Sequence, residues 1–298
     1  MEPIEKYLEA QADKVHRFLE REVESWTEIP PPLREAMAYS LLAGGKRLRP
    51  ILVLATAEAL GGSADKALPF AGAVEMIHTY SLIHDDLPAM DDDDFRRGKP
   101  TNHKVFGEAM AILAGDALLT KAFGLLARAA REAELPAETA LALIEEGSRR
   151  FGAEGMVGGQ VLDIQSENRR LSLSELEAIH RGKTGDLIIY SVRLGALISG
   201  STKDQLELLT SFAGLLGLAF QIQDDILDVA GDQQTIGKPV GSDQAKNKAT
   251  YPSLIGLEKS RELLRRTVEE AKQLLTRPCG MNTERLMQVA DYFALREK

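Results

Sequence analysis

Apolar residues recur at helical spacing along nearly all of the 298-residue chain, and the alternating runs rich in Val, Ile and Thr that strands require are scarce. The first pattern gives each helix a continuous apolar face, so it predicts an all-α fold. Helices are expected near residues 3–24, 33–43, 47–60, 66–87, 105–132, 136–150, 153–167, 174–200, 203–230, 250–276 and 284–296.

Local signals support several of these helices. Three prolines at residues 30–32 precede one helix, where proline is tolerated because the first N–H groups have no helical partner. The segment SLSELE, which starts at Ser172, has the pattern of an N-terminal cap. Gly155, Gly158 and Gly159 fall together in a later helix, and each costs about 1 kcal/mol of helix propensity relative to alanine. Either close helix packing or space for a ligand would explain them.

Composition and charge exclude several classes of protein. The chain is 44% hydrophobic and 27% charged, as in ordinary soluble globular proteins. Its formal net charge of -9 argues against a nucleic-acid surface or a polybasic membrane anchor. Cys279 is the only cysteine, which excludes an internal disulfide or a CxxC zinc site and fits a reducing compartment. No proline- or serine-rich linker divides the chain, so we expect a single domain over residues 1–298.

The ends and the apolar runs predict a cytoplasmic protein. The N-terminal segment MEPIEKYLEA lacks the basic and apolar regions of a signal peptide. The longest apolar run, 208–220, has polar flanks and is shorter than the roughly 20 residues that span a bilayer. We therefore expect no stable membrane anchor.

An aspartate-rich segment, DDLPAMDDDD, begins at Asp85 and ends one long helix. So many like charges need bound cations or basic neighbours. Pro88 disfavours helical geometry in the residue before it, so we expect the chain to loop out and to bring Asp91 back towards Asp85. An uninterrupted helix would instead align Asp85 with Asp92. The residues alone leave open which of the later aspartates binds a metal ion.

A second acidic cluster, QIQDDILD, lies at the end of another apolar helix. Asp224 and Asp228 are four residues apart, so both carboxylates face the same side of a helix, with Asp225 between them. Aspartate ligands favour a hard cation, above all Mg²⁺, which keeps several waters and completes its shell with phosphate oxygens. Either cluster alone would fit a solvated acidic helix end, but two such clusters indicate metal binding.

Basic residues alternate with these clusters in GGKRLRP, RRGKP, RGKTG and TIGKPVGSDQAKNKATYP. Arginine forks and lysines suit diphosphate oxygens. GGKR does not have the spacing of a Walker A loop. The joint pattern predicts a polyphosphate site in which metal ions bind one face and basic residues the other.

In this order and spacing the motifs resemble those of the trans-prenyl diphosphate synthases. The shared segments are GGKRLRP, DDLPAMD with RRGKPTNH, KTG, and FQIQDDILD with GK and KATYP, over roughly residues 40–255. Tyr80, five residues before Asp85, and the four residues that separate the aspartates of the first motif are similar to bacterial farnesyl diphosphate synthases. The resemblance implies the isoprenoid synthase fold, with helices around a central cavity, and a homodimer.

The resemblance also implies a reaction and a set of residues. Isopentenyl diphosphate would condense with dimethylallyl or geranyl diphosphate to give farnesyl diphosphate, with about three Mg²⁺ ions per site. The metal ligands would be Asp85, Asp86, Asp91, Asp224, Asp225 and Asp228. Isopentenyl diphosphate would be bound by Lys46, Arg49, His78 and Arg97. The allylic diphosphate would be bound by Arg96, Lys183, Thr184, Gln221, Lys238 and Lys248. The catalytic set would be Asp85, Lys183, Thr184, Gln221 and Asp224.

The chemistry agrees with this assignment. An allylic C–O bond ionises once the charge on the leaving diphosphate is neutralised, as divalent cations and lysines would do. Thr184 and Gln221 offer oxygen dipoles to the cation without strong nucleophilicity, and an apolar cavity would exclude water. The released diphosphate would accept the proton. One departure from the family pattern is Asp186, which follows KTG where a small apolar residue is usual.

Product length would depend on cavity depth. Tyr80 lies about 7.5 Å along the helix from Asp85, so its ring, with Ser81 beside it, would block a growing chain. An ordinary core tyrosine is the other interpretation, and a geranylgeranyl diphosphate synthase is the alternative function.

Two other classes of protein have weaker support. Glu75 to His78 and Glu177 to His180 both spell ExxH, a di-iron bundle pattern, but that class offers no role for the aspartate clusters. A non-catalytic partner subunit of a prenyl synthase would not need the complete second aspartate motif. We expect two further histidines, His84 and His103, to be hydrogen-bonded structural residues.

Overall fold

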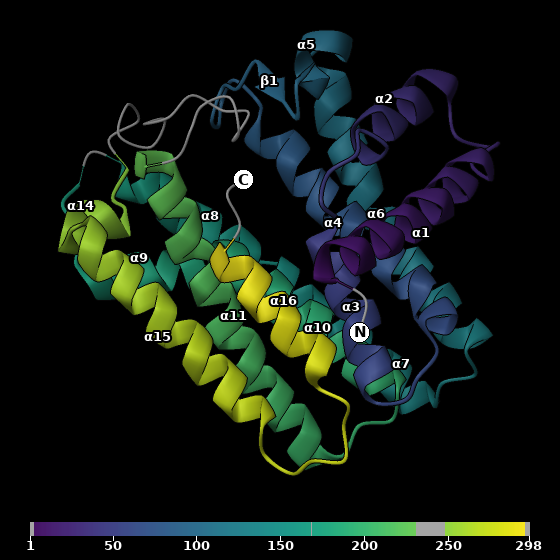
Figure 1. The fold of residues 1–298 in the computed structure, drawn as a ribbon. Coiled ribbons are helices and arrows are strands. Elements are labelled where there is room, and N and C mark those ends of the chain that lie inside the picture. Colours follow the sequence, from purple (N-terminus) through teal and green to yellow (C-terminus); the bar gives the residue numbers. More distant parts are fainter. Residues whose placement is uncertain (1–2, 168, 231–247, 296–298) are drawn as a thin grey trace. The chain divides into compact units, whose positions relative to one another are not determined.

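The described part of the chain is mainly helical, with one short hairpin, which confirms the all-α prediction (Figure 1). The structure is a computed structural model and describes residues 3–167, 169–230 and 248–295. The chain divides into two compact units, residues 1–57 with 62–144 and residues 58–61 with 145–298. This division concerns packing and not independent folding, so the single domain stays a prediction.

The first unit is built around a buried central helix. It contains α1 (Ile4–Glu24), α2 (Pro31–Leu41), most of α3 (Leu48–Ala59), α4 (Ala64–Asp85), the hairpin strands β1 (Phe95–Arg96) and β2 (Lys99–Pro100), α5 (Asn102–Phe106), α6 (Glu108–Glu132) and the start of α7 (Ala137–Phe151). Helix α4 packs against α6, α1 and α2 and is buried over most of its length. A Cβ atom at Gly72 would lie 2.4 Å from Cε1 of Phe18, so glycine is needed where α1 meets α4. The first aspartate motif thus follows a rigid core helix.

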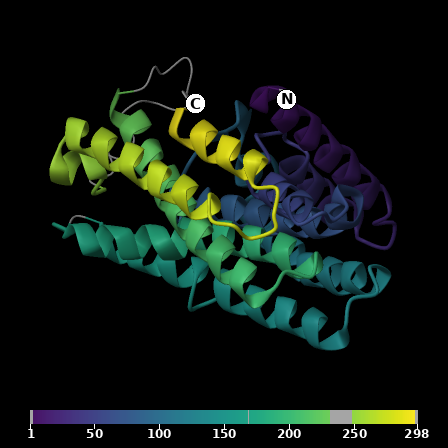
Figure 2. The ribbon, with the colours of Figure 1, turned by 60° about the horizontal axis from the view of Figure 1, so that its bottom comes forward.

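The second unit is arranged around α11. It contains the end of α7, α8 (Met156–Ser166), α9 (Leu173–His180), the π-helical turn η1 (Arg181–Gly185), α10 (Asp186–Ile198), α11 (Lys203–Ala230), α14 (Tyr251–Ile255), α15 (Leu257–Leu275) and α16 (Glu284–Leu295). Helix α11 contacts α10, α15 and α16, and Figure 2 shows the yellow-green α15 and the yellow α16 beside it. The second aspartate motif therefore lies on a core helix, near its C-terminal end.

The two local start signals are confirmed, although α2 begins at Pro31 and not at residue 33. Pro31 and Pro32 occupy the first turn of α2. At the start of α9 the hydroxyl of Ser172 accepts from the backbone N–H of Glu175 over 3.3 Å, and the carboxylate of Glu175 accepts from the N–H of Ser172 over 2.8 Å. These two bonds form a capping box, which satisfies two N–H groups that the helix leaves without partners.

Three predicted helices are interrupted, and one element was not predicted. Gly107 and Gly256, with φ of 84° and 85°, separate α5 from α6 and α14 from α15. Such positive φ values suit glycine and end a helix, so the continuous helices expected at 105–132 and 250–276 are wrong there. The helix expected at 174–200 contains the π-helical turn. The β1–β2 hairpin is too short for its period to be read from the sequence.

By length and composition alone, α6 and α11 would each qualify as a membrane-spanning helix. In the structure α6 packs against α4, α2 and α5, and α11 packs against α10, α15 and α16. Core helices of folded proteins pass the same test of hydropathy, so this finding carries no conclusion about a membrane.

Candidate active site

The first aspartate motif forms a loop that returns to the end of α4. The helix ends at Asp85, and the backbone N–H of Asp91 donates to the carbonyl of Asp85 over 2.9 Å. The predicted effect of Pro88 is therefore confirmed, because the continuous helix that would align Asp85 with Asp92 does not form. Asp92 instead has a φ of 50°. The loop thus places the backbone of Asp91 beside Asp85.

Arg96, in β1, makes a bidentate ion pair with Asp86. Its Nε donates to Oδ1 and Oδ2 of Asp86 over 2.7 and 2.9 Å, and its Nη2 lies 3.5 Å from Oδ2 of Asp93. Burial tends to lower the pKa of Arg96, but the hydrogen bonds and charge of Asp86 raise it overall. These two side chains line a small pocket with Tyr39 and Arg97. Metal binding by Asp86 would have to share its carboxylate with Arg96.

Two further arginines, Arg97 and Arg47, are held in place by contacts with the GGKRLRP segment and with α4. Nη1 of Arg97 donates to the carbonyl of Gly44, and a Cβ atom at Gly45 would lie 2.6 Å from Cζ of Arg97. The guanidinium group of Arg47 donates to the carboxylate of Glu75, and each of these two side chains is only 1% exposed. The buried carboxylate of Glu75 therefore lies next to two arginines, since Nη2 of Arg97 is 3.9 Å from it.

His78, one helical turn after Glu75, contacts a predicted substrate-binding arginine. Its Nε2 lies 3.3 Å from Nη1 of Arg49. Burial, and then the charges of Arg49, Arg97, Arg96 and Arg47, lower the pKa of His78 well below its usual value. The ring is therefore neutral, and because arginine can only donate, Nε2 accepts. The contact between His78 and Arg49 is thus formed before any ligand binds.

Tyr80 and Ser81, the predicted chain-length residues, lie further along α4. Tyr80 is 5% exposed and its ring meets that of His84 edge-on, with centroids 5.8 Å apart. Burial and the charge of Asp85 raise the pKa of Tyr80 to about 12, so the phenol is neutral. The hydroxyl of Ser81 donates to the carbonyl of His78 over 2.9 Å. Nε2 of His84 lies 3.0 Å from the carbonyl of Ile112, as expected for a structural histidine.

The second unit positions Lys183 and Thr184 in the π-helical turn η1. A Cβ atom at Gly159 of α8 would lie 2.1 Å from the backbone N of Lys183, and one at Gly217 of α11 would lie 3.2 Å from Cα of Gly185. The glycine at 159 therefore serves close backbone packing, which is one of the two interpretations given from the sequence. Thr184 is buried, and the turn is held between two helices.

Asp163 joins two lysines that were predicted to bind the allylic diphosphate. Nζ of Lys183 donates to Oδ2 of Asp163 over 2.7 Å, and Nζ of Lys248 lies 3.5 Å from the same oxygen. The structure thus brings together two basic residues that are far apart in the sequence. Asp163 was not singled out from the sequence, although it stands four residues after Gly159 on α8. The third predicted lysine, Lys238, lies outside the described residues.

The second aspartate motif lies on the continuous helix α11, so Asp224 and Asp228 face the same side, as predicted. Asp224 is exposed, Asp228 is half-buried, and Asp225 is only 5% exposed. Oδ2 of Asp225 accepts from the backbone N–H of Tyr251 over 2.9 Å. Burial raises the pKa of Asp225, while contacts with His180 and Tyr251 act against that rise.

Gln221, one turn before Asp225, contacts His180 at the end of α9. Its Nε2 lies 2.9 Å from Nδ1 of the imidazole, whose Nε2 lies 3.5 Å from Oδ2 of Asp225. The ring stacks on Tyr251 with centroids 5.7 Å apart and an interplanar angle of 22°. His180 was considered in the sequence only as part of an ExxH pair.

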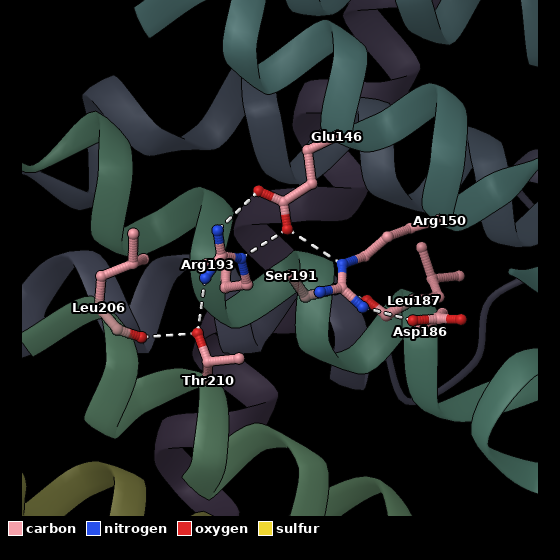
Figure 3. Close-up of polar contacts among 8 residues, drawn as sticks. All are labelled: Glu146, Arg150, Asp186, Leu187, Ser191, Arg193, Leu206 and Thr210. Atoms are coloured by element: carbon pink, nitrogen blue, oxygen red, sulfur yellow. Dashed lines mark hydrogen bonds and ion pairs between the residues drawn. The ribbon is translucent and has the colours of Figure 1, made fainter. Parts of the chain in front are cut away.

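A charge network surrounds Asp186, the residue that departs from the family pattern (Figure 3). Nη1 of Arg150 donates to Asp186, and Nε of Arg150 donates to Glu146 over 3.0 Å. Arg193 donates to Glu146 as well and to the hydroxyl of Thr210 over 2.7 Å. Burial alone would raise the pKa of Glu146, but the two arginines lower it. The carboxylate of Asp186, next to the π-helical turn, therefore has Arg150 as its partner within the protein.

Carboxylate oxygens, which the two aspartate motifs supply, are the donors that a hard cation such as Mg²⁺ prefers. Among the described residues, no three His, Cys, Asp or Glu side chains form a group that could hold a metal ion. Asp85, Asp91 and Asp224 are at least partly accessible, which leaves room for the waters and phosphate oxygens of a magnesium shell. The di-iron interpretation loses support because Glu75 is bonded to Arg47 and His78 contacts Arg49.

Comparisons with known proteins identify the family of this chain. The family model described as polyprenyl synthetase matches residues 30–278. A farnesyl diphosphate synthase of Geobacillus stearothermophilus is 53% identical over 99% of this chain and 98% of its own. The large subunit 1 of a chloroplastic heterodimeric geranylgeranyl pyrophosphate synthase of Arabidopsis thaliana is 47% identical over 98% of this chain and 79% of its own. The apo crystal structure of an FPP/GFPP synthase from Zymomonas mobilis, 36% identical, aligns with a TM-score of 0.84 over 98% of both chains.

Proposed function

Because the chain belongs to the polyprenyl synthetase family, we propose that it condenses isopentenyl diphosphate with dimethylallyl and then geranyl diphosphate to give farnesyl diphosphate. The observation that carries this proposal is the loop after α4, which holds Asp91 beside Asp85 by a 2.9 Å backbone hydrogen bond, with Arg96 and Arg97 directly after it. A carboxylate group followed by paired arginines provides both metal ligands and diphosphate donors.

Isopentenyl diphosphate would be bound in the first unit by four basic or polar residues, Lys46, Arg49, His78 and Arg97. Three features prepare this site without a ligand: the Arg47–Glu75 pair, the contact of Arg97 with Gly44, and the neutral ring of His78. A pre-organised arrangement costs less ordering entropy when the diphosphate binds.

The allylic diphosphate would be bound by Arg96, Lys183, Lys248 and Lys238. We propose that about three Mg²⁺ ions are held by Asp85, Asp86, Asp91, Asp224, Asp225 and Asp228. Bound Mg²⁺ would neutralise the charge that develops on the leaving diphosphate. Lys183 and Lys248 already share Asp163, so their ammonium groups are held as a pair for the same anion.

Ionisation leaves a positive charge on the allylic carbons, and Thr184 and Gln221 would face that charge with oxygen dipoles. Thr184 is buried, which limits the access of water to the cation. The double bond of isopentenyl diphosphate then attacks, and the released diphosphate takes the proton lost from the adjacent carbon. This account requires no side-chain base.

We propose a fifteen-carbon product because the buried ring of Tyr80 is fixed against His84 and would stop chain growth. A geranylgeranyl diphosphate synthase is the second candidate, since relatives with that name are also similar to this chain. We further propose a cytoplasmic homodimer without a stable membrane anchor. Ile112 and Leu113, which are 44% and 53% exposed on α6, support a helix-mediated contact between two copies.

The direct test is to incubate the purified chain with isopentenyl diphosphate, dimethylallyl diphosphate and Mg²⁺ and to measure product length by chromatography. We expect farnesyl diphosphate, loss of product on chelation by EDTA, and recovery when Mg²⁺ is restored. A twenty-carbon product would favour the second candidate. A folded chain that makes no prenyl product alone would contradict the proposed activity and favour a non-catalytic subunit.

A further inference from the structure

We propose that Arg150 is a positioning residue for the allylic diphosphate: it pairs with the carboxylate of Asp186 and so prevents that negative charge from repelling the anion bound at Lys183. This inference rests on the proposed function, which assigns Lys183 to the allylic diphosphate. Arg150 would touch neither substrate, and its effect would be transmitted through Asp186.

Asp186 carries a negative charge next to a segment that is proposed to bind an anion. It is the first residue of α10 and follows Lys183 by three residues, on the helical segment that continues from η1. Its side chain is only 15% exposed, so water screens the charge incompletely. A carboxylate and a diphosphate repel each other, so without a partner Asp186 would oppose diphosphate binding.

A helix-capping role does not explain this carboxylate. Acidic residues at the start of a helix usually accept from backbone N–H groups that lack a helical partner. Here η1 leads into α10 without a break, and the backbone N–H of Asp186 already donates to the carbonyl of Arg181. Among the described residues, the carboxylate of Asp186 makes no hydrogen bond or ion pair other than that with Arg150.

Arg150 lies between two carboxylates, as Figure 3 shows. Its Nε donates to Glu146 over 3.0 Å, and its Nη1 donates to Asp186. Glu146 has a second partner, because Arg193 donates to both of its oxygens, over 3.0 Å in the case of Nη2 and Oε2. Loss of Arg150 would thus leave Asp186, and not Glu146, without compensation.

The end of α7, which carries Arg150, is fixed against α10. A Cβ atom at Gly147 would lie 3.3 Å from the hydroxyl oxygen of Tyr190, so the two helices approach closely there. The rings of Phe151 and Tyr190 meet edge-on, with centroids 4.6 Å apart. The guanidinium group of Arg150 is therefore directed at Asp186 before any ligand binds.

The proposal predicts different effects on the two substrates. Arg150→Met keeps most of the length of the side chain and removes its charge. We expect the KM for dimethylallyl diphosphate to rise about 10-fold, the size of an interaction between unit charges about 10 Å apart at an effective dielectric constant of about 20. The KM for isopentenyl diphosphate should change less than about 2-fold, because its proposed ligands lie in the first unit. Assays at pH 8 favour the ionised carboxylate, since burial raises the pKa of Asp186 and the charge of Arg150 acts against that rise.

A double-mutant cycle tests whether the effect passes through Asp186. Asp186→Asn removes the carboxylate charge, so its combination with Arg150→Met should return the KM for dimethylallyl diphosphate to within about 2-fold of the unsubstituted value. Arg150→Lys keeps the charge and should retain most of the affinity. The matched control is Arg149→Met, which removes the same charge from an exposed position on the same helix and should leave both KM values unchanged.

Three results would overturn the proposal: equal rises in the KM values for both substrates, losses that multiply in the double variant, or the same effect in Arg149→Met. Thermal unfolding of each variant identifies a general loss of fold. If Arg150→Met does not fold, the comparison passes to Arg150→Lys and the double variant, and a KM in either that is raised about 10-fold contradicts charge compensation.

A binding measurement tests the same inference without activity. Calorimetric titration with Mg²⁺ and dimethylallyl thiodiphosphate, whose bridging sulfur atom resists ionisation, gives the Kd of the allylic ligand. This Kd should rise about 10-fold in Arg150→Met and return in the double variant. An unchanged Kd in Arg150→Met would refute the role of Arg150 even in an active enzyme. If the Kd values are as expected but no prenyl product forms from the reactive substrates, the proposed function fails and charge compensation by Arg150 stands.

Discussion

Arg47 and Glu75 form an ion pair in which each side chain is only 1% exposed, and Nη2 of Arg97, which is predicted to bind isopentenyl diphosphate, lies 3.9 Å from Glu75. Taking one charge away from such a pair leaves the other without compensation in a low-dielectric environment. The pair therefore connects the stability of the first unit to the shape of its basic site.

Glu75→Gln should destabilise the protein by about 3–5 kcal/mol, because the charge of Arg47 would remain buried without its partner. Urea-induced unfolding measures the change in the free energy of unfolding. Glu20→Gln, which removes the same charge from an exposed pair with His16, is the matched control and should change stability by less than about 0.5 kcal/mol. Equal effects of the two substitutions would show that the buried pair has no special role.

Gly159→Ala should destabilise the protein by about 1–3 kcal/mol and lower kcat, because a Cβ atom there would lie 2.1 Å from the backbone N of Lys183. The gain in helix propensity, about 1 kcal/mol, is too small to offset displacement of the turn. Gly214→Ala on α11 is the control, since no heavy atom lies within 4 Å of its added Cβ, and it should be neutral or stabilising. Unfolding curves and steady-state rates check both variants, and a fully active, stable Gly159→Ala would contradict the prediction.

Asp91→Asn should lower kcat by about 100-fold or more, whereas Asp92→Asn should cost less than about 10-fold. The loop holds the backbone of Asp91 beside Asp85, while Asp92 has a φ of 50° and an exposed side chain. Rates measured over a Mg²⁺ titration distinguish weaker metal binding from slower chemistry. The reverse order of the two losses would assign the metal ligand to Asp92.

Tyr80→Ala should shift the product from fifteen to twenty carbons, because it removes the ring that is buried against His84. Tyr80→Phe keeps the ring and should keep the fifteen-carbon product. Chromatography of the dephosphorylated products gives the chain length of each. If Tyr80→Ala still stopped at fifteen carbons, Tyr80 would be an ordinary core residue and the limit would lie elsewhere.

The stability of the protein should fall in acid partly because of His78. Burial and the nearby arginines lower its pKa in the folded state, whereas the unfolded chain titrates near pH 6.5. Below about pH 6.5 the unfolded state therefore binds a proton that the folded state does not. The contribution of His78 to the free energy of unfolding is complete above that pH and is lost as the pH falls. His78→Gln should be less sensitive to acid than the unsubstituted protein when unfolding is measured at pH 7.5 and 5.5. Parallel curves for the two proteins would contradict this.

Local signals in the sequence were enough to predict the helices and the loop at Pro88. Periodicity identifies an amphipathic helix from its own residues, and proline acts on its immediate neighbours. The breaks at Gly107 and Gly256 were missed because glycine is also common inside helices, and only the fold determines its φ. The two-residue strands were too short for any period to be read.

The partners within the site were harder to predict because they depend on contacts between distant segments. Asp163 lies 20 residues from Lys183 and 85 from Lys248, and Glu75 lies 28 from Arg47. No local pattern marks such pairs. The motifs predicted a set of site residues, whereas the partners that these residues contact became visible only in three dimensions.

The π-helical turn between α9 and α10 also sets the angle around the helix axis between the side chains before it and those after it. A π turn accommodates one residue more than an α-helical turn, so residues before it are offset by about 100° from the positions that an unbroken α-helix would give them. His180 precedes the turn and Asp186 follows it. Deleting a single residue from RGKTG would restore a regular helix but would rotate one of these side chains away from its partner. The contact of His180 with Gln221 and that of Asp186 with Arg150 are thus compatible only in the longer, offset form.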